Sequence, residues 1–168
     1  EQRLGELQQA LMDDDCWLPG KVRAVSEICR AASLSASTGD VETLRNGVDR
    51  PVGDVDNGWR APLGTSAEYK FGADTSVSEA RIVFDSDLNR TDTSRGGGQG
   101  RLQNMRCYSS LGDQPYAPPA TLVRSFRIET LGADGTWIEA ARCENNFQRL
   151  VRIPLNGTAR GVRLVPER

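Results

Sequence analysis

From residue 31 onward the sequence consists of short alternating apolar and polar runs, separated by Gly, Pro, Asn and Asp. Ile82 and Phe84 fall on one face of such a run, and Val151 and Ile153 fall on one face of another. Alternation with a period of two is typical of half-buried β-strands, and no long helical pattern lies between the runs. We therefore expect an all-β fold, either a β-sandwich or a jelly roll.

The first 20 residues depart from this pattern. Leu4, Leu7 and Leu11 recur at helical spacing, which predicts one short amphipathic helix followed by a turn. Its apolar stripe must pack on the domain behind it or on a missing neighbour. We expect residues 1–20 to form an N-terminal helix and linker, and residues 21–168 to form the sandwich domain.

The chain of 168 residues contains no histidine. This excludes Ser-His-Asp and Cys-His catalysis as well as His-ligated metal centres, so we expect a non-catalytic module that can still be part of a larger enzyme. A formal net charge of −2 argues against general nucleic-acid binding. No apolar run approaches the roughly 20 residues that cross a bilayer, so we expect no membrane insertion.

The four cysteines are Cys16, Cys29, Cys107 and Cys143, and no C-x-x-C spacing indicates a zinc ribbon or a thioredoxin-like site. One or two disulfides in an oxidising compartment and four buried free thiols are equal alternatives, and the pairing stays open. We expect an extracellular or periplasmic location.

Asp85, Asp87 and Asn89 follow an expected strand and place two carboxylates and an amide at a loop mouth. The D-x-D-x-N opening is not followed by the glycine and the glutamate that an EF-hand requires, so that motif is excluded. These side chains can bind sugar hydroxyls or a cation, or they can merely cap their own turns. Both interpretations stay open.

Two further groups can contribute to a binding site. An indole beside a guanidinium, as in Trp59-Arg60, can offer a sugar ring a stacking floor and a hydrogen-bonding fork. A tryptophan in a β-sandwich more often packs in the core, so that alternative stays open. In the polar segment 143–149, Asn146 and Arg149 can converge with the earlier loops at one end of the sandwich, or can only stabilise their own loop.

Several segments in order resemble discoidin-like domains, the coagulation-factor type C, galactose-binding-like modules. They are ASLSAS at 32–37, TLRNGV at 43–48, GWRAP at 58–62 and, at the end, TARGVRLVP at 158–166. The resemblance implies a jelly-roll β-sandwich of about eight strands whose loops at one end bind a ligand, most often carbohydrate in bacterial members. Sugar-binding members frequently use a histidine, which this chain lacks.

Many discoidin-like domains hold a structural calcium ion near a turn that corresponds to residues 46–49 of this chain. The resemblance therefore implies a calcium site with Asp49 as a ligand, and Glu167 is the counterpart of the late glutamate that usually helps to bind the ion. We expect no other cofactor.

A second resemblance concerns bacterial FAD-dependent oxidoreductases. Residues 7–20 are similar to the helix that closes their catalytic part, and residues 83–88 and 146–149 are similar to segments of the discoidin-like region that follows in some of them. This resemblance implies that the chain is the C-terminal region of such a protein, without its flavin-binding part.

These observations together predict a non-catalytic carbohydrate-binding module that recognises a polysaccharide or glycan through loops at one end of the sandwich. The expected ligand-binding residues are Trp59, Arg60, Asp85, Asp87, Asn89, Asn146 and Arg149. All but two of the 21 basic residues are arginines, which suit bidentate recognition, so an acidic sugar is an expected ligand. The alternative is a structural or docking domain without a free ligand, whose partner is a catalytic domain of the same parent oxidoreductase.

Overall fold

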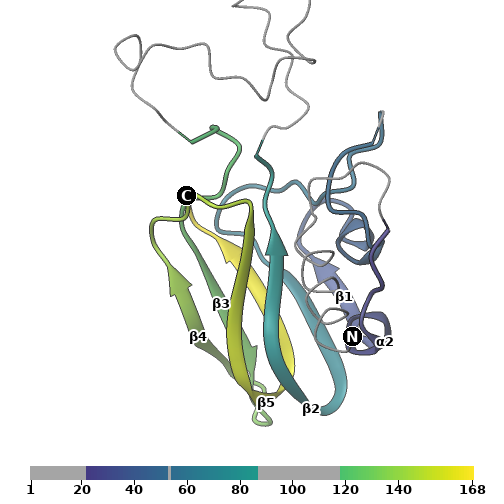
Figure 1. Ribbon diagram of the computed structural model, residues 1–168. Coiled ribbons are helices and arrows are strands. Elements are labelled where there is room, and N and C mark those ends of the chain that lie inside the picture. Colours follow the sequence, from purple (N-terminus) through teal and green to yellow (C-terminus); the bar gives the residue numbers. More distant parts are fainter. Residues whose placement is uncertain (1–21, 53, 87–117) are drawn as a thin grey trace, which may run out of the picture.

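The computed structural model describes residues 22–52, 54–86 and 118–168 (Figure 1). The elements in these ranges are α2 (Glu27–Ala31), β1 (Ser33–Ala36), the 3-10 helix η1 (Glu42–Arg45), β2 (Ala67–Val83), β3 (Phe126–Leu131), β4 (Trp137–Cys143) and β5 (Leu150–Pro166). The expected all-β class is confirmed. The helix expected over residues 1–20 lies outside the described residues, and neither described helix is long and apolar enough to cross a membrane.

The five strands form one antiparallel sheet in the order β1-β2-β5-β3-β4. β2 and β5 are 17 residues long and pair with each other over most of their lengths, with a register shift between Lys70 and Thr75. Both strands bend there, so that the sheet folds over itself into two layers (Figure 1). A register shift of this kind leaves residues of one strand unpaired and lets the pair of strands turn together.

Each bent strand contributes one limb to each layer. The five-stranded layer contains β1, β3, β4 and the limbs 67–70 of β2 and 161–166 of β5. The second layer contains, among the described residues, the limbs 75–83 of β2 and 150–159 of β5. Because β2 and β5 each contribute a limb to both layers, the described residues form a two-layered β-sandwich like the eight-stranded one that was expected.

The hydrophobic core lies between the two layers. Phe126 and Ile128 of β3 are each 1% exposed, and the Phe126 ring contacts that of Phe84, with centroids 5.0 Å apart. Leu122 completes the buried cluster, and partly buried apolar residues from both layers pack around it, among them Ile82, Val151, Ile153, Leu155, Val162 and Leu164. The faces predicted from the sequence alternation are therefore the buried faces.

The antiparallel order gathers five loop segments at one end of the molecule, which we call the loop end (Figure 1). Their described residues are 37–52 and 54–66, which belong to one segment, and 84–86, 118–125, 144–149 and 167–168. The opposite end, which we call the bend end, contains the β3–β4 turn and the bends of β2 and β5. All described residues that were expected to bind a ligand lie on segments of the loop end.

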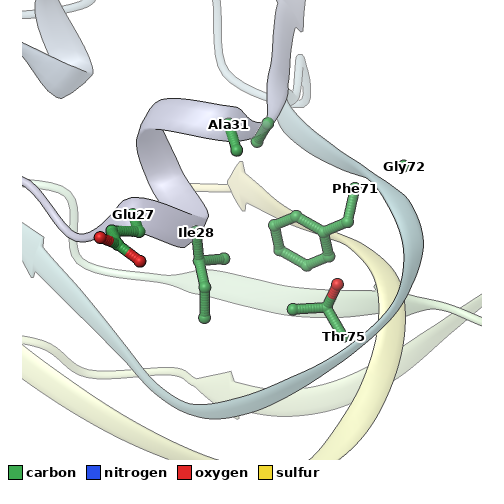
Figure 2. Close-up of a pocket in the computed structure, with 7 residues that line it drawn as sticks. Glu27, Ile28, Ala31, Phe71, Gly72 and Thr75 are labelled. Atoms are coloured by element: carbon green, nitrogen blue, oxygen red, sulfur yellow. The ribbon is translucent and has the colours of Figure 1, made fainter.

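A shallow pocket of about 270 Å³ lies between α2 and the bend of β2 (Figure 2). Its lining consists of Glu27, Ile28, Ala31, Ala32, Phe71, Gly72 and Thr75. Glu27 is the one charged residue among them, and none was expected to bind a ligand. The pocket therefore lies apart from the residues of the loop end.

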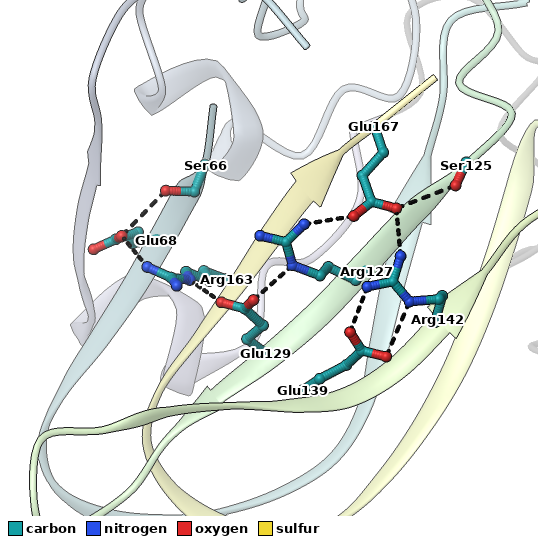
Figure 3. A network of polar contacts seen from close by, with 9 residues as sticks. All are labelled: Ser66, Glu68, Ser125, Arg127, Glu129, Glu139, Arg142, Arg163 and Glu167. Carbon is teal, nitrogen blue, oxygen red and sulfur yellow. Dashed lines mark hydrogen bonds and ion pairs between the residues drawn. The ribbon is translucent and has the colours of Figure 1, made fainter. Parts of the chain in front are cut away.

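Alternating acidic and basic side chains cross the face of the five-stranded layer that points away from the core (Figure 3). This ion-pair ladder consists of Glu68, Arg163, Glu129, Arg127, Glu167, Arg142 and Glu139, with Ser66 and Ser125 beside it. The strand register places Glu68 and Glu129 directly opposite Arg163. Opposite charges facing each other on neighbouring strands stabilise a sheet, so the register explains the ladder.

Glu129 is the best-shielded carboxylate of the ladder, with 8% of the residue exposed. It accepts hydrogen bonds from Nε of Arg127, at 2.6 Å, and from Nε of Arg163. Burial raises the pKa of the Glu129 carboxyl, but the two arginines lower it by more, so that its pKa lies below the usual value. Such a group stabilises the fold above its unfolded-state pKa, and the stabilisation is lost as the pH falls through the folded-state pKa.

We predict that Glu129→Gln lowers the free energy of unfolding at pH 7 by about 1–3 kcal/mol, because Arg127 and Arg163 each lose an anionic acceptor. The wild type should lose stability on acidification below about pH 4.5, and the variant should lose less over the same range. Urea denaturation at a series of pH values measures both effects. Glu79→Gln, which removes an exposed pair with Arg152, is the matched control and should cost less than about 1 kcal/mol. Equal losses in the two variants would contradict this role of the ladder.

Candidate functional site

The described residues that were expected to bind a ligand come from three segments of the loop end. Trp59 and Arg60 lie in the long connection before β2, Asp85 follows β2, and Asn146 and Arg149 lie between β4 and β5. Asp87 and Asn89 lie outside the described residues. The structure thus brings together the segments that the sequence analysis expected to converge.

Asn146 is 5% exposed, and its amide bonds to the backbone on both sides. Nδ2 donates to the carbonyl oxygens of Val123, at 2.9 Å, and Gln148, at 3.0 Å. Oδ1 accepts from the backbone N–H of Gln148 at 3.0 Å, and the backbone N–H of Asn146 donates to the carbonyl of Arg124. Asn146 therefore fixes the 144–149 loop to the segment before β3, and a ligand contact of its own stays a prediction.

Arg149 is also 5% exposed and links three segments. Its Nη1 donates to the carbonyl of Phe84 at 3.0 Å and to Oγ of Ser86 at 3.2 Å, and its Nη2 donates to the carbonyl of Asp49. The guanidinium thus connects the 144–149 loop to the end of β2 and to the turn at Asp49. The guanidinium of Arg149 faces the protein interior. A direct contact between Arg149 and a ligand stays a prediction.

Between these two buried residues the chain exposes an aromatic side chain. Phe147 is 70% exposed, although Asn146 before it and Arg149 shortly after it are buried. From the sequence, residues 143–149 were expected to form a polar connection, and Phe147 was not among the expected ligand-binding residues. The available signal was a single large apolar residue in an otherwise polar segment. Among the described residues, Phe147 is the most exposed aromatic side chain, and it lies on a loop that Asn146 and Arg149 hold in place.

Trp59 is partly buried. Its exposure is therefore between that of a core residue and that of a stacking platform. Its Nε1–H donates to the carbonyl of Thr38 at 2.8 Å. Gly39 lies against the indole, with φ at +80°, and a Cβ at this position would lie 3.1 Å from Cδ1 of Trp59 and 2.8 Å from the carbonyl oxygen of Arg60. The position of the indole therefore depends on the backbone of residues 38 and 39.

Arg60 and Asp85 are exposed charged residues of the loop end. The Arg60 side chain is 71% exposed and forms an ion pair with Asp56. Its hydrogen bond to Asp56 raises the pKa of Arg60 above the usual value, and the charge of Asp85 contributes in the same direction. Asp85 and Arg60 therefore lie within electrostatic range of each other, with hydrogen-bonding groups at the surface.

Asp49, which the sequence analysis assigned to a calcium site, is held by arginines. Its carboxylate accepts from Nη2 of Arg23 at 2.9 Å and from Nη2 of Arg81 at 2.8 Å. Burial raises the pKa of the Asp49 carboxyl, but the hydrogen bonds from Arg81 and Arg23 outweigh it and hold the pKa below its usual value. We call Arg23, Arg81 and Arg149, which converge on Asp49, the arginine clamp.

Cysteine and metal-ligand geometry add little to the site. Cys29 and Cys143 are free thiols, and Cys16 and Cys107 lie outside the described residues. Within the three described ranges, no group of three or more Cys, Asp or Glu side chains could hold a metal ion.

No protein family model matches the sequence, and no curated protein matches it. Solved structures do match. The family 32 carbohydrate-binding module of Streptococcus pneumoniae EndoD has a TM-score of 0.50 and 20% sequence identity, and the match covers 84% of this chain and 85% of that one. The chain therefore has the fold of a family 32 module, which is the discoidin-like, galactose-binding-like β-sandwich that was expected.

Two further matches have lower TM-scores. The family 32 module of C. perfringens NanJ, solved in complex with galactose, has a TM-score of 0.46 and 9% identity over 86% of this chain and 88% of that one. Chitosan-binding module 1 from a chitosanase/glucanase of Paenibacillus sp. IK-5 has a TM-score of 0.47 and 12% identity over 84% and 86% of the two chains. The comparisons do not confirm the resemblance to FAD-dependent oxidoreductases.

We predict that Gly39→Ala displaces the indole of Trp59 and destabilises the fold, since a Cβ at φ +80° is strained and also collides with the backbone of Arg60. Gly64→Ala is the matched control, because Gly64 has φ +82° and nothing within 4 Å of an added Cβ. The control should cost about 1–2 kcal/mol, and Gly39→Ala should cost more. The Nε1–H resonance of Trp59 in ¹H–¹⁵N NMR should shift only in Gly39→Ala. Identical spectra and equal losses in the two variants would contradict the described packing.

Proposed function

We propose that this chain is a non-catalytic carbohydrate-binding module that recognises a polysaccharide or glycan through its loop end. The observation that carries the proposal is the exposed ring of Phe147, presented on a loop that the buried residues Asn146 and Arg149 hold in place. The shared fold with a solved carbohydrate-binding module supports it. The absence of histidine supports a binding role over hydrolysis by a histidine-containing triad.

The proposed mechanism combines an apolar face with exposed polar groups. The apolar face of a sugar ring would lie against Phe147, because stacking removes apolar surface from water on both sides. The carboxylate of Asp85 would accept hydrogen bonds from sugar hydroxyls, and the guanidinium of Arg60 would donate to them. Asn146 and Arg149 act as positioning residues, because each is buried and bonded to backbone oxygens.

Trp59 would contribute a second, partly buried edge of the site. Its indole N–H is bonded to Thr38, so any ligand contact would involve the ring rather than the N–H group. Asp87 and Asn89 come two and four positions after Asp85 in the chain, and we keep them as proposed contributors on that basis. A shallow site of this kind binds weakly, with a dissociation constant of about micromolar to millimolar, equivalent to roughly −8 to −4 kcal/mol.

The arrangement does not favour an acidic sugar. An acidic sugar was expected because arginine is abundant, but Arg60 already forms an ion pair with Asp56, and the acidic Asp85 lies near Arg60. We therefore propose that the module prefers a neutral glycan. Within this proposal, three polysaccharides of different charge serve as probes: galactan as a neutral one, alginate as an anionic one and chitosan as a cationic one.

Affinity electrophoresis of the whole chain in gels that contain each polysaccharide tests the proposal. We expect the neutral polysaccharide to retard the wild type most. Phe147→Ala should weaken binding about tenfold, which corresponds to about 1.4 kcal/mol. Asp85→Asn should weaken it as well, since a neutral amide is a poorer acceptor for hydroxyls than a carboxylate.

Ile138→Ala is the control for Phe147→Ala. Ile138 is an exposed apolar residue, at 59%, but it lies next to the β3–β4 turn at the bend end. The control should migrate like the wild type in every gel. A wild type that is not retarded by any probe would contradict the proposal and favour the docking alternative, and unchanged retardation of Phe147→Ala would contradict the proposed site.

A further inference from the structure

The resemblance to discoidin-like domains assigns a structural calcium ion to the turn at residues 46–49. Here Arg23, Arg81 and Arg149 converge on Asp49 in this turn. We propose that the arginine clamp replaces the calcium ion, so that the turn is held by guanidinium groups and binds no divalent cation. The proposal rests on the poor fit of these residues to a calcium ion. It does not depend on which ligand the loop end binds.

Three oxygen atoms of the turn, besides those of the Asp49 carboxylate, accept hydrogen bonds in this structure. The carbonyl of Gly47 accepts from the backbone N–H of Arg23 at 2.7 Å, and Oδ1 of Asn46 accepts from the backbone N–H of Val48 at 2.8 Å. The carbonyl of Asp49 accepts from Arg149. A calcium ion requires about six to eight oxygen ligands directed at one point. These oxygens instead point at separate N–H donors.

The carboxylate of Asp49 is also committed. Arg81 donates to both oxygens in a fork, with Nη2 2.8 Å from Oδ2 and Nη1 3.2 Å from Oδ1, and Arg23 donates to Oδ2 from Nη2 and Nε. The three side chains are mostly buried, at about one-fifth exposure each. A divalent cation at Asp49 would have to displace at least one guanidinium and would then lie beside the other, where repulsion between like charges is strong.

The second expected calcium ligand is committed in the same way. The Glu167 carboxylate accepts from Arg127 and, at 2.7 Å, from Nη1 of Arg142, and Oγ of Ser125 donates to it as well. These partners belong to the ion-pair ladder (Figure 3). Neither carboxylate that the resemblance assigned to calcium is therefore available in the arrangement that the ion would require.

The clamp connects parts of the chain that are far apart in the sequence. Arg23 lies 26 residues before Asp49, Arg81 lies 32 residues after it, and Arg149 lies 100 residues after it. Three guanidinium groups therefore join the segment before α2, β2 and the 144–149 loop to one turn. Arginine suits this role because it remains charged at all ordinary pH values and donates in a fixed planar fork.

Thermal melting of the whole chain in calcium chloride and in EDTA tests the proposal. We expect the same Tm in both, whereas a structural site filled at about 100 times its dissociation constant would raise the Tm by about 5–10 °C. Arg81→Gln and Asp49→Asn should both lower the Tm in either buffer. Arg152→Gln, which removes one arginine from an exposed pair on the same strand pair, is the matched control and should lower it less.

A calcium-dependent rise in Tm that Asp49→Asn abolishes would overturn the proposal. A rise that Asp49→Asn leaves unchanged would come from another part of the chain and would support the assignment of the clamp. If Asp49→Asn does not fold, ¹H–¹⁵N NMR of the wild type decides between the two. The Nε–H resonances of Arg23 and Arg81 should be unaffected by calcium chloride, and their displacement by the ion would overturn the proposal.

Discussion

The buried guanidinium of Arg149 is the interaction on which the geometry of the loop end depends. A charge that is 5% exposed must be hydrogen-bonded, because its desolvation would otherwise cost several kcal/mol. The two Nη atoms of Arg149 donate to acceptors from the Asp49 turn, from Phe84 and from Ser86. These bonds fix three segments relative to one another. Phe147 is presented to solvent because the loop on both sides of it is anchored.

Arginine has the same kind of role elsewhere in the described part of the chain. Arg45 donates to the carbonyls of Cys29, Arg30 and Ala32, where α2 ends and β1 begins. Arg163 lies between two glutamates and stacks on Trp137, with its guanidinium 4.5 Å from the ring centroid. The planar fork that suggested ligand recognition from the sequence is thus used for contacts within the protein. The arginine content alone is therefore weak evidence for an acidic ligand.

The sequence was sufficient for strand segments such as those at Ile82 and Phe84 and at Val151 and Ile153, with their buried faces, because alternation is a local property that a sheet with one buried face imposes. It was not sufficient for the bend of β2 and β5, since the register shift after Lys70 depends on pairing with residues about 90 positions away. The convergence of Asn146 and Arg149 with earlier loops could be predicted. Their burial could not, because it depends on Asp49 and Phe84, which are remote in the sequence. Phe147 was missed because composition described its segment as polar.

The arginine clamp and the proposed binding site share one residue, so the position of the ligand loop depends on the clamp. Arg149 belongs to both, since it donates to the Asp49 turn and anchors the loop that presents Phe147. In a calcium-dependent domain, loss of the ion would loosen the turn and the ligand loop together. Here the guanidinium groups of the arginine clamp take that role. Because they belong to the chain and cannot dissociate, the loop keeps its position whatever the calcium concentration around the protein. A weak single site of this kind would act best when tethered to a second module, because linkage turns the second binding event into an intramolecular one at about millimolar effective concentration.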